Sequence, residues 1–195
     1  FSLEVSPFAE NTYIVWDESN ECVIVDPGVY TTADQHQLQS AIEKRGLKPV
    51  RLLNTHAHLD HCGRIPLLSK RGFQGEIITT AASRELARLV MLDSAHLQEE
   101  EARYQTRRNA RRGHRQKVRP LYSVLDALNS TEHFGRTAEF DKPMQLTEGI
   151  RATFLDAGHI LGSSIVEIWI TEGSETRKLV FSGDLGNNCA PLMKD

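Results

Sequence analysis

The sequence predicts an α/β fold in which helices cover mixed β-sheets. Short apolar segments rich in β-branched residues alternate along the chain with helix-like segments of mixed polarity. The 195 residues are 39% hydrophobic and 25% charged, which is ordinary for a globular domain large enough to bury a core. Three of the apolar segments lead into histidine, aspartate and glycine residues. This placement indicates a polar site at the ends of strands.

The N-terminal part predicts two paired strands, a helix and a third strand. The strands are apolar runs bounded by turn residues, and we place them at residues 11–16, 21–25 and 50–54. Leu38 and Ile42 lie four residues apart on one face of the helix, which Gly46 ends. These segments form the first part of a layered sheet structure.

The remaining chain repeats this alternation. Two helices are predicted from their apolar spacing, at residues 65–71 and 83–92. In the second helix we expect Leu86, Leu89 and Val90 to face the core. Four further strands are predicted, at residues 76–79, 150–155, 164–170 and 178–181.

Three histidines and an aspartate lie close together directly after the 50–54 strand: His56, His58, Asp60 and His61. Side chains two residues apart in an extended segment share a face, so His56 and His58 can point to the same side. A single histidine is more often structural than a ligand, but four ligand residues in one short run favour a metal site. Imidazole and carboxylate without a local thiol pair suit Zn²⁺, with Mn²⁺ and Fe²⁺ as alternatives.

Two later strands end in the same way. Gly158-His159 follows the 150–155 strand, and Gly183-Asp184 follows the 178–181 strand. Glycine beside a ligand lets the backbone turn sharply and approach a metal closely. We therefore predict that His159 and Asp184 join the 56–61 motif in one pocket.

Composition argues against several other classes of protein. No apolar run approaches the roughly 18 residues needed to cross a bilayer, and the N-terminus lacks a basic and apolar signal segment. Cys22, Cys62 and Cys189 are odd in number and widely spaced, which indicates reduced thiols. We expect a cytoplasmic protein without a membrane partner, and its oligomeric state is left open.

Together, Thr55–His61, Gly158-His159 and Ser182-Gly183-Asp184 resemble the metallo-β-lactamase superfamily of binuclear hydrolases. The resemblance implies an αββα sandwich and two metal ions, expected to be zinc. His56, His58 and His159 would hold one metal, Asp60 and His61 would hold the second, and Asp184 would bridge the pair. A water or hydroxide between the metals would be the nucleophile, oriented by Asp60.

From about residue 65 the chain resembles the β-CASP group of RNA-processing nucleases, relatives of the cleavage and polyadenylation endonuclease. The matching blocks occur in the same order, at residues 72–77, 91–95, 120–122 with 126–127, 157–163 and 181–186 with Pro191. This resemblance implies a phosphodiesterase that cleaves RNA, with single-stranded DNA as a further substrate.

Residues 1 to about 63 resemble the glyoxalase II type thioesterases instead. Pro7–Tyr13 and Ile24–Gly28 carry this second resemblance. The two resemblances meet near Cys62–Arg64, and we hypothesise that the chain is a mosaic or a recombinant. A thioesterase that uses the same metals is therefore an alternative function, and a catalytically weak nucleic-acid-binding fragment is a third.

The superfamily normally supplies one more histidine to the second metal, downstream of the bridging aspartate, and β-CASP nucleases add a cap domain there. The sequence after Asp184 contains no histidine. We therefore expect a single metallo-β-lactamase-like domain over residues 1–195, truncated after the bridging motif and lacking the cap. Water, a neighbouring chain, or one of three other histidines would complete the second metal site: His96, His114 or His133.

A run of arginines follows three glutamates at residues 99–101, although the net charge of the chain is −3. Its structural interpretation is a solvated helix with ion pairs such as Glu99 with Arg103. Its functional interpretation is a surface that follows the phosphates of a nucleic acid. Both interpretations can be true. We expect the nucleic acid to contact four of the arginines: Arg107, Arg108, Arg111 and Arg112.

Overall fold

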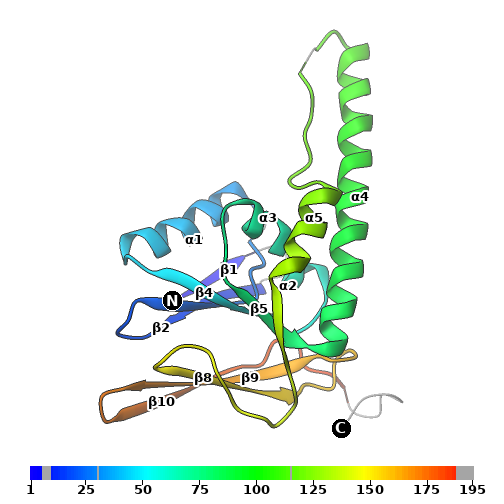
Figure 1. Ribbon diagram of the computed structural model, residues 1–195. Coiled ribbons are helices and arrows are strands. Elements are labelled where there is room, and N and C mark those ends of the chain that lie inside the picture. The colour runs from blue at the N-terminus through cyan, green and yellow to red at the C-terminus, as the bar shows by residue number, and fades with distance from the viewer. Residues whose placement is uncertain (6–9, 30, 115, 188–195) are drawn as a thin grey trace.

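The computed structural model describes residues 1–5, 10–29, 31–114 and 116–187. These residues form two facing β-sheets and one layer of helices (Figure 1). They correspond to the α, β and β layers of the αββα sandwich, and the predicted α/β class is confirmed.

The larger sheet has six strands in chain order, antiparallel at first and then parallel. Its strands are β1 (Ser2–Val5), β2 (Glu10–Trp16), β3 (Glu21–Val25), β4 (Lys48–Leu53), β5 (Glu76–Thr80) and β6 (Phe134–Ala138). Pairing is antiparallel from β1 to β3 and parallel from β3 to β6. Parallel neighbours need crossover connections, so the carboxyl ends of β3 to β6 meet at one edge of the sheet.

Helices make those crossovers and cover the outer face of this sheet (Figure 1). They are α1 (Thr32–Lys44), α2 (Leu59–Cys62), α3 (Ile65–Lys70), α4 (Ala81–Arg111), α5 (Val124–Ser130) and a 3₁₀ turn at Thr131–His133. Leu52 and Ile77 of the sheet share a buried cluster with Met91 of α4. Cys62 is fully buried in the same cluster, behind the metal-binding motif, as a small packing residue.

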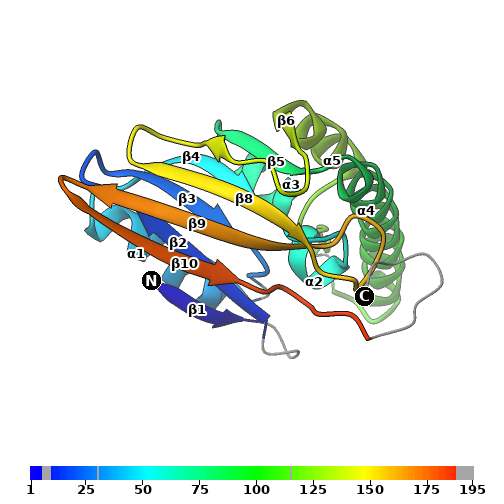
Figure 2. The same ribbon diagram turned by 90° about the horizontal axis from the view of Figure 1, so that it is seen from below.

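The second sheet is a four-stranded antiparallel layer in the order β10-β9-β8-β7. Its strands are β7 (Met144–Gln145), β8 (Ile150–Asp156), β9 (Ser164–Glu172) and β10 (Glu175–Phe181). Figure 2 shows this layer in front of the larger sheet. Phe154 and Ile168 pack between the sheets against Val25 and Leu53. This inter-sheet core fixes β8 and β10 relative to β4.

The main departure from the sequence prediction is the length of α4, which has 31 residues. Apolar spacing predicted only residues 83–92, because the residues of α4 that are buried beyond Met91 are all small: Ser94, Ala95 and Ala102. Leu89 was wrongly expected in the core and is 66% exposed, whereas Ala87, Met91 and Ala95 are buried there. Within the described residues, no helix is both long and apolar enough to cross a membrane.

A buried tyrosine joins α4 to the loop that follows the metal-binding motif. The Tyr122 hydroxyl donates a 2.8 Å hydrogen bond to the Gly63 carbonyl, and Ser94 Oγ of α4 lies 3.1 Å from the same hydroxyl. Tyr122 is fully buried, so water cannot replace these partners. The tyrosine therefore anchors α2 against the helical layer.

Replacing Tyr122 with phenylalanine should lower the free energy of unfolding by about 1–3 kcal/mol, because the Gly63 carbonyl loses its buried donor. Urea denaturation followed by circular dichroism measures this change. Tyr104→Phe is the matched control, since Tyr104 is 59% exposed, and it should change stability by less than about 0.5 kcal/mol. Equal losses in the two variants would contradict the anchoring role.

Candidate metal centre

The candidate site lies where strand ends of both sheets meet. His56 follows β4, and Asp60 and His61 lie in α2 just beyond it. His159 lies in the loop between β8 and β9, and Asp184 follows β10. Residues that are far apart in sequence therefore reach the same edge of the sandwich.

Hydrogen bonds tie these loops to one another. The backbone N–H and the Oγ of Ser164 both donate to the Thr55 carbonyl at 2.9 Å, which joins the start of β9 to the end of β4. The hydroxyls of Thr80 and Ser83, at the start of α4, both donate to the Gly162 carbonyl. The loop that carries His159 is thus held by both β4 and α4.

Two glycines make the sharp turns that the sequence predicted beside ligands. Gly158 has φ +64° and Gly183 has φ +55°, a backbone region that side chains with a Cβ rarely adopt. A Cβ on Gly183 would also lie 2.8 Å from Thr55 Oγ1. The turn before Asp184 is therefore packed directly on the β4 end.

Three histidine nitrogens face one another at ligand-like distances. His58 Nδ1 lies 3.1 Å from His56 Nε2 and 3.2 Å from His159 Nε2. Asp184 Oδ2 lies 3.7 Å from His56 Nε2 and 3.4 Å from His159 Nε2. Tetrahedral ligands at about 2.0–2.1 Å from a zinc ion are about 3.3 Å apart. The four side chains therefore fit one divalent metal.

The other oxygen of Asp184 faces a second set of ligands. Asp184 Oδ1 lies 3.5 Å from His61 Nε2, which is itself 3.8 Å from Asp60 Oδ2. One carboxylate thus presents Oδ2 to the three-histidine set and Oδ1 to the set formed by Asp60 and His61. This arrangement fits a metal pair that shares a bridging ligand.

Asp26 is a site residue that the sequence reasoning took only as the end of a strand. It follows β3, and its carboxylate lies 3.0 Å from His61 Nδ1. The same carboxylate accepts hydrogen bonds from the backbone N–H and Oγ1 of Thr55 and from Asn54 Nδ2. Because Nδ1 of His61 is engaged by Asp26, Nε2 is the nitrogen that faces Asp184. The available signal was its position after an apolar strand, like the other ligands.

Glu10 is a second residue that was missed. It is buried, its Oε1 lies 4.0 Å from His61 Nδ1, and neither carboxylate oxygen has a hydrogen-bond partner among the described residues. Burial and the charge of Asp26 raise the pKa of Glu10 to about 9. Glu10, Asp26 and His61 together form a group that could hold a metal. Since Asp26 engages Nδ1 of His61, we interpret this group as support behind the metal pocket.

The surroundings lower the pKa of two histidines of the site and raise the pKa of a third. Burial lowers the pKa of His56 to about 3, and burial with the charge of His159 lowers the pKa of His58. Burial also acts to lower the pKa of His61, but the hydrogen bond and charge of Asp26 outweigh it and raise that pKa to about 9. A metal must therefore displace a proton from His61.

The other residues considered for the site lie elsewhere. The two potential metal-binding groups found among the described residues include none of His96, His114 and His133. Arg107, Arg108, Arg111 and Arg112 lie at the end of α4 that projects away from the sheets (Figure 1). They form a separate surface.

Comparison with known proteins places the chain in a family. Residues 5–195 match the family model of the metallo-beta-lactamase superfamily. The transcription termination factor FttA of Thermococcus kodakarensis is 34% identical over 134 residues, which are 68% of this chain and 18% of that protein. Ribonuclease TTHA0252 of Thermus thermophilus is 31% identical over 144 residues, 74% of this chain and 28% of that protein. The chain thus spans less than a third of the length of these curated relatives.

Solved structures share the fold at low identity. A di-iron-bound form of TTHA1623 is 24% identical with a TM-score of 0.53, covering 98% of this chain and 78% of that one. The FEZ-1 metallo-beta-lactamase of Legionella gormanii is 14% identical with a TM-score of 0.54, covering 92% and 59%. These similarities support the sandwich architecture alone.

Replacing Asp184 with asparagine should reduce bound metal, because the amide carries no charge to share between two cations. Elemental analysis after reconstitution and gel filtration measures the metal per chain, with at least one equivalent expected to be lost. Asp93→Asn, on the exposed side of α4, is the matched control and should retain the wild-type content. Full metal content in the Asp184 variant would contradict the bridging geometry.

The metal-free protein should become less stable as the pH rises from about 6.5 to about 9. The raised pKa of His61 means that its protonation stabilises the fold fully below pH 6.5 and that this stabilisation is lost through about 9. The pKa of Glu10 rises from its ordinary 4.5 to about 9 on folding, so its contribution to stability declines from about pH 4.5 to about 9 and adds to the loss across this range. Denaturation in chelator across this range tests the trend. Glu10→Gln should flatten the slope, and an unchanged slope would count against it.

Proposed function

The chain belongs to the metallo-β-lactamase superfamily, and from this premise we propose that it is a metal-dependent phosphodiesterase that cleaves RNA. The observation that best supports the proposal is the position of Asp184, whose two oxygens face two sets of ligands. The names of the relatives, a ribonuclease and a transcription termination factor, favour RNA as the substrate. Single-stranded DNA is a second candidate substrate.

We propose the following ligands for the two metals. His56, His58 and His159 would hold the first metal, Asp60 and His61 would hold the second, and Asp184 would lie between the two sets. Zn²⁺ suits this set of imidazoles and carboxylates, with Mn²⁺ and Fe²⁺ as alternatives. Divalent metals at such a site polarise a phosphoryl oxygen and lower the pKa of water, so that hydroxide is available near neutral pH.

The side chains around the metals have distinct roles in this proposal. Asp60 is the catalytic residue, because its partly exposed carboxylate can accept a hydrogen bond from the attacking water and orient it toward phosphorus. Asp26 holds His61 with Nε2 toward the pocket, as its 3.0 Å contact with Nδ1 indicates. The low pKa of His56 keeps its ring neutral and able to bind a cation.

Two finer assignments accompany this function. We propose that the chain is part of a β-CASP nuclease, a view supported by the sequence blocks from residue 65 onward and by the RNA-related names of the relatives. We also propose a cytoplasmic location, which an RNA substrate favours. The mosaic origin of residues 1–63 stays a hypothesis.

Labelled RNA incubated with chelated protein should be cleaved only after Zn²⁺ or Mn²⁺ is restored. Asp60→Asn should lower the cleavage rate by at least about 100-fold, because the amide lacks the negative charge that would bind the second metal and is too weak a base to take a proton from the attacking water. His96→Ala is the control variant, since His96 lies exposed on α4 and pairs with Glu100 outside the site. It should cleave RNA at the wild-type rate.

A glutathione thioester assayed beside the RNA separates the alternatives. Metal-dependent thioester hydrolysis without RNA cleavage would replace the nuclease proposal with the thioesterase suggested by residues 1–63. RNA binding without turnover of either substrate, in protein shown to contain metal, would identify a nucleic-acid-binding fragment instead.

A further inference from the structure

The end of α4 and the segment that returns from it form an arm outside the folded core. We define the arm as residues 102–114 and 116–119. It projects beyond the other helices, and its own returning segment lies beside it (Figure 1). Val118 N–H donates a 3.0 Å hydrogen bond to Thr106 Oγ1, which fastens the returning segment to the helix. After Ala102, no residue in the described part of the arm is buried. Core packing therefore does not explain the sequence of the arm.

The arm carries a concentrated positive charge. Eight of the 23 lysines and arginines of the chain lie between Ala102 and Pro120, with no aspartate or glutamate among them. Arg103 pairs with Glu99 at 3.5 Å, at the base of the arm. Beyond it, no carboxylate among the described residues lies within ion-pair distance of the four arginines at the helix end: Arg107, Arg108, Arg111 and Arg112. Their charge is available to an external anion.

The spacing of these arginines is unfavourable for an isolated helix. Arg107 and Arg111 are four residues apart on one row, and Arg108 and Arg112 repeat that spacing on the next row. Like charges at this spacing repel each other and destabilise a helix. The helix dipole offsets part of this repulsion, since Arg108 and Arg111 lie in the last turn of α4. A bound polyanion would relieve the repulsion along the whole row.

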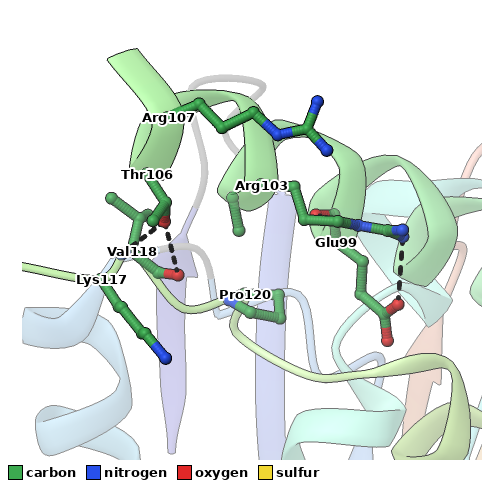
Figure 3. Close-up of a pocket in the computed structure, with 8 residues that line it drawn as sticks. Glu99, Arg103, Thr106, Arg107, Lys117, Val118 and Pro120 are labelled. Carbon is green, nitrogen blue, oxygen red and sulfur yellow. Dashed lines mark hydrogen bonds and ion pairs between the residues drawn. The ribbon is translucent and has the colours of Figure 1, made fainter. Parts of the chain in front are cut away.

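Two adjoining hollows lie on the arm and share Arg107. The larger, of about 450 Å³, lies between α4 and the returning segment and is lined by Arg103, Arg107 and Lys117 (Figure 3). The smaller, of about 290 Å³, is lined by the four arginines and by Tyr104. Tyr104 is 59% exposed, so its ring is available for a base to stack on. Guanidinium groups beside an exposed aromatic ring suit single-stranded nucleic acid.

We propose that the arm is a second contact surface for RNA, at a distance from the metal centre. This proposal rests on the proposed function in one respect, since the proposed function identifies the polyanion as RNA. Ser83, which contacts the loop of His159 through Gly162, precedes Arg107 by 24 residues, or about 36 Å of helix. At about 3.4 Å per stacked nucleotide, a strand that reaches from the metal centre to the arm spans on the order of ten nucleotides. The arm thus favours long RNA over short fragments.

The test measures binding by fluorescence anisotropy, with chelator present so that no RNA is cleaved. The probes are labelled single-stranded RNAs of 25 and 5 nucleotides. In the arm variant, Arg107, Arg108, Arg111 and Arg112 are all changed to glutamate, and a second variant carries glutamine at the same positions. The control variant changes four exposed basic residues on other elements to glutamate: Lys44, Lys48, Lys142 and Arg177.

Both arm variants should weaken binding of the 25-nucleotide RNA by at least about tenfold at low salt. The slope of log Kd against log salt should decrease by about 3, since each single-strand phosphate contact contributes about 0.7. The preference of the wild type for 25 over 5 nucleotides should shrink in the same variants. The control variant should keep the affinity and the slope of the wild type.

Three outcomes would overturn the proposal. These are unchanged binding of the long RNA by the arm variants, an equal loss in the control variant, and competition by polyglutamate as effective as that by unlabelled RNA. The last result would identify a general surface for acidic polymers. Because binding is measured without metal, a chain that binds long RNA through the arm but cleaves nothing would refute the proposed function and leave the arm proposal standing.

Discussion

The candidate metal pocket depends on the buried carboxylate of Asp26. Burial alone would raise the pKa of this group, but the hydrogen bond and charge of His61 and the hydrogen bonds from Thr55 hold the pKa below its usual range. A buried charge is tolerated only when its oxygens are satisfied in this way. Its backbone has φ +45°, an unusual conformation for a residue other than glycine. The structure therefore accepts local strain at the end of β3 to fix β4 and the His61 ring together.

The pocket also depends on the packing of the two sheets. His56 and His61 come from the larger sheet and its crossover, whereas His159 and Asp184 come from the smaller sheet. The inter-sheet core and the double hydrogen bond from Ser164 to Thr55 set the distance between these groups. The ligands are thus brought together by tertiary structure, and each short motif supplies only part of the set.

The sequence reveals the parts of this structure that leave a periodic or local signal. The apolar runs before His56, His159 and Asp184 identify three strands. The position of these residues after the strands predicts that their side chains lie close together. The role of Glu10 leaves no such signal, because it depends on contact with His61, which lies far along the chain. Asp26 shares the position after an apolar strand, but its contact with His61 cannot be predicted from that position alone. The strand β6 is also missed, since only its two end residues are buried. The full length of α4 is hidden for a similar reason, because none of its described residues after Ala102 is buried.

The attachment of α4 determines how a force on its far end is transmitted to the rest of the molecule. Its first turn holds the Gly162 carbonyl through Thr80 and Ser83, three residues from His159. Beyond this turn, Ala87, Met91 and Ala95 hold the helix in the core, so it cannot pivot freely about its first turn. A force on the far end of α4, near Arg107, is therefore resisted by this buried packing, which shields the loop that positions His159.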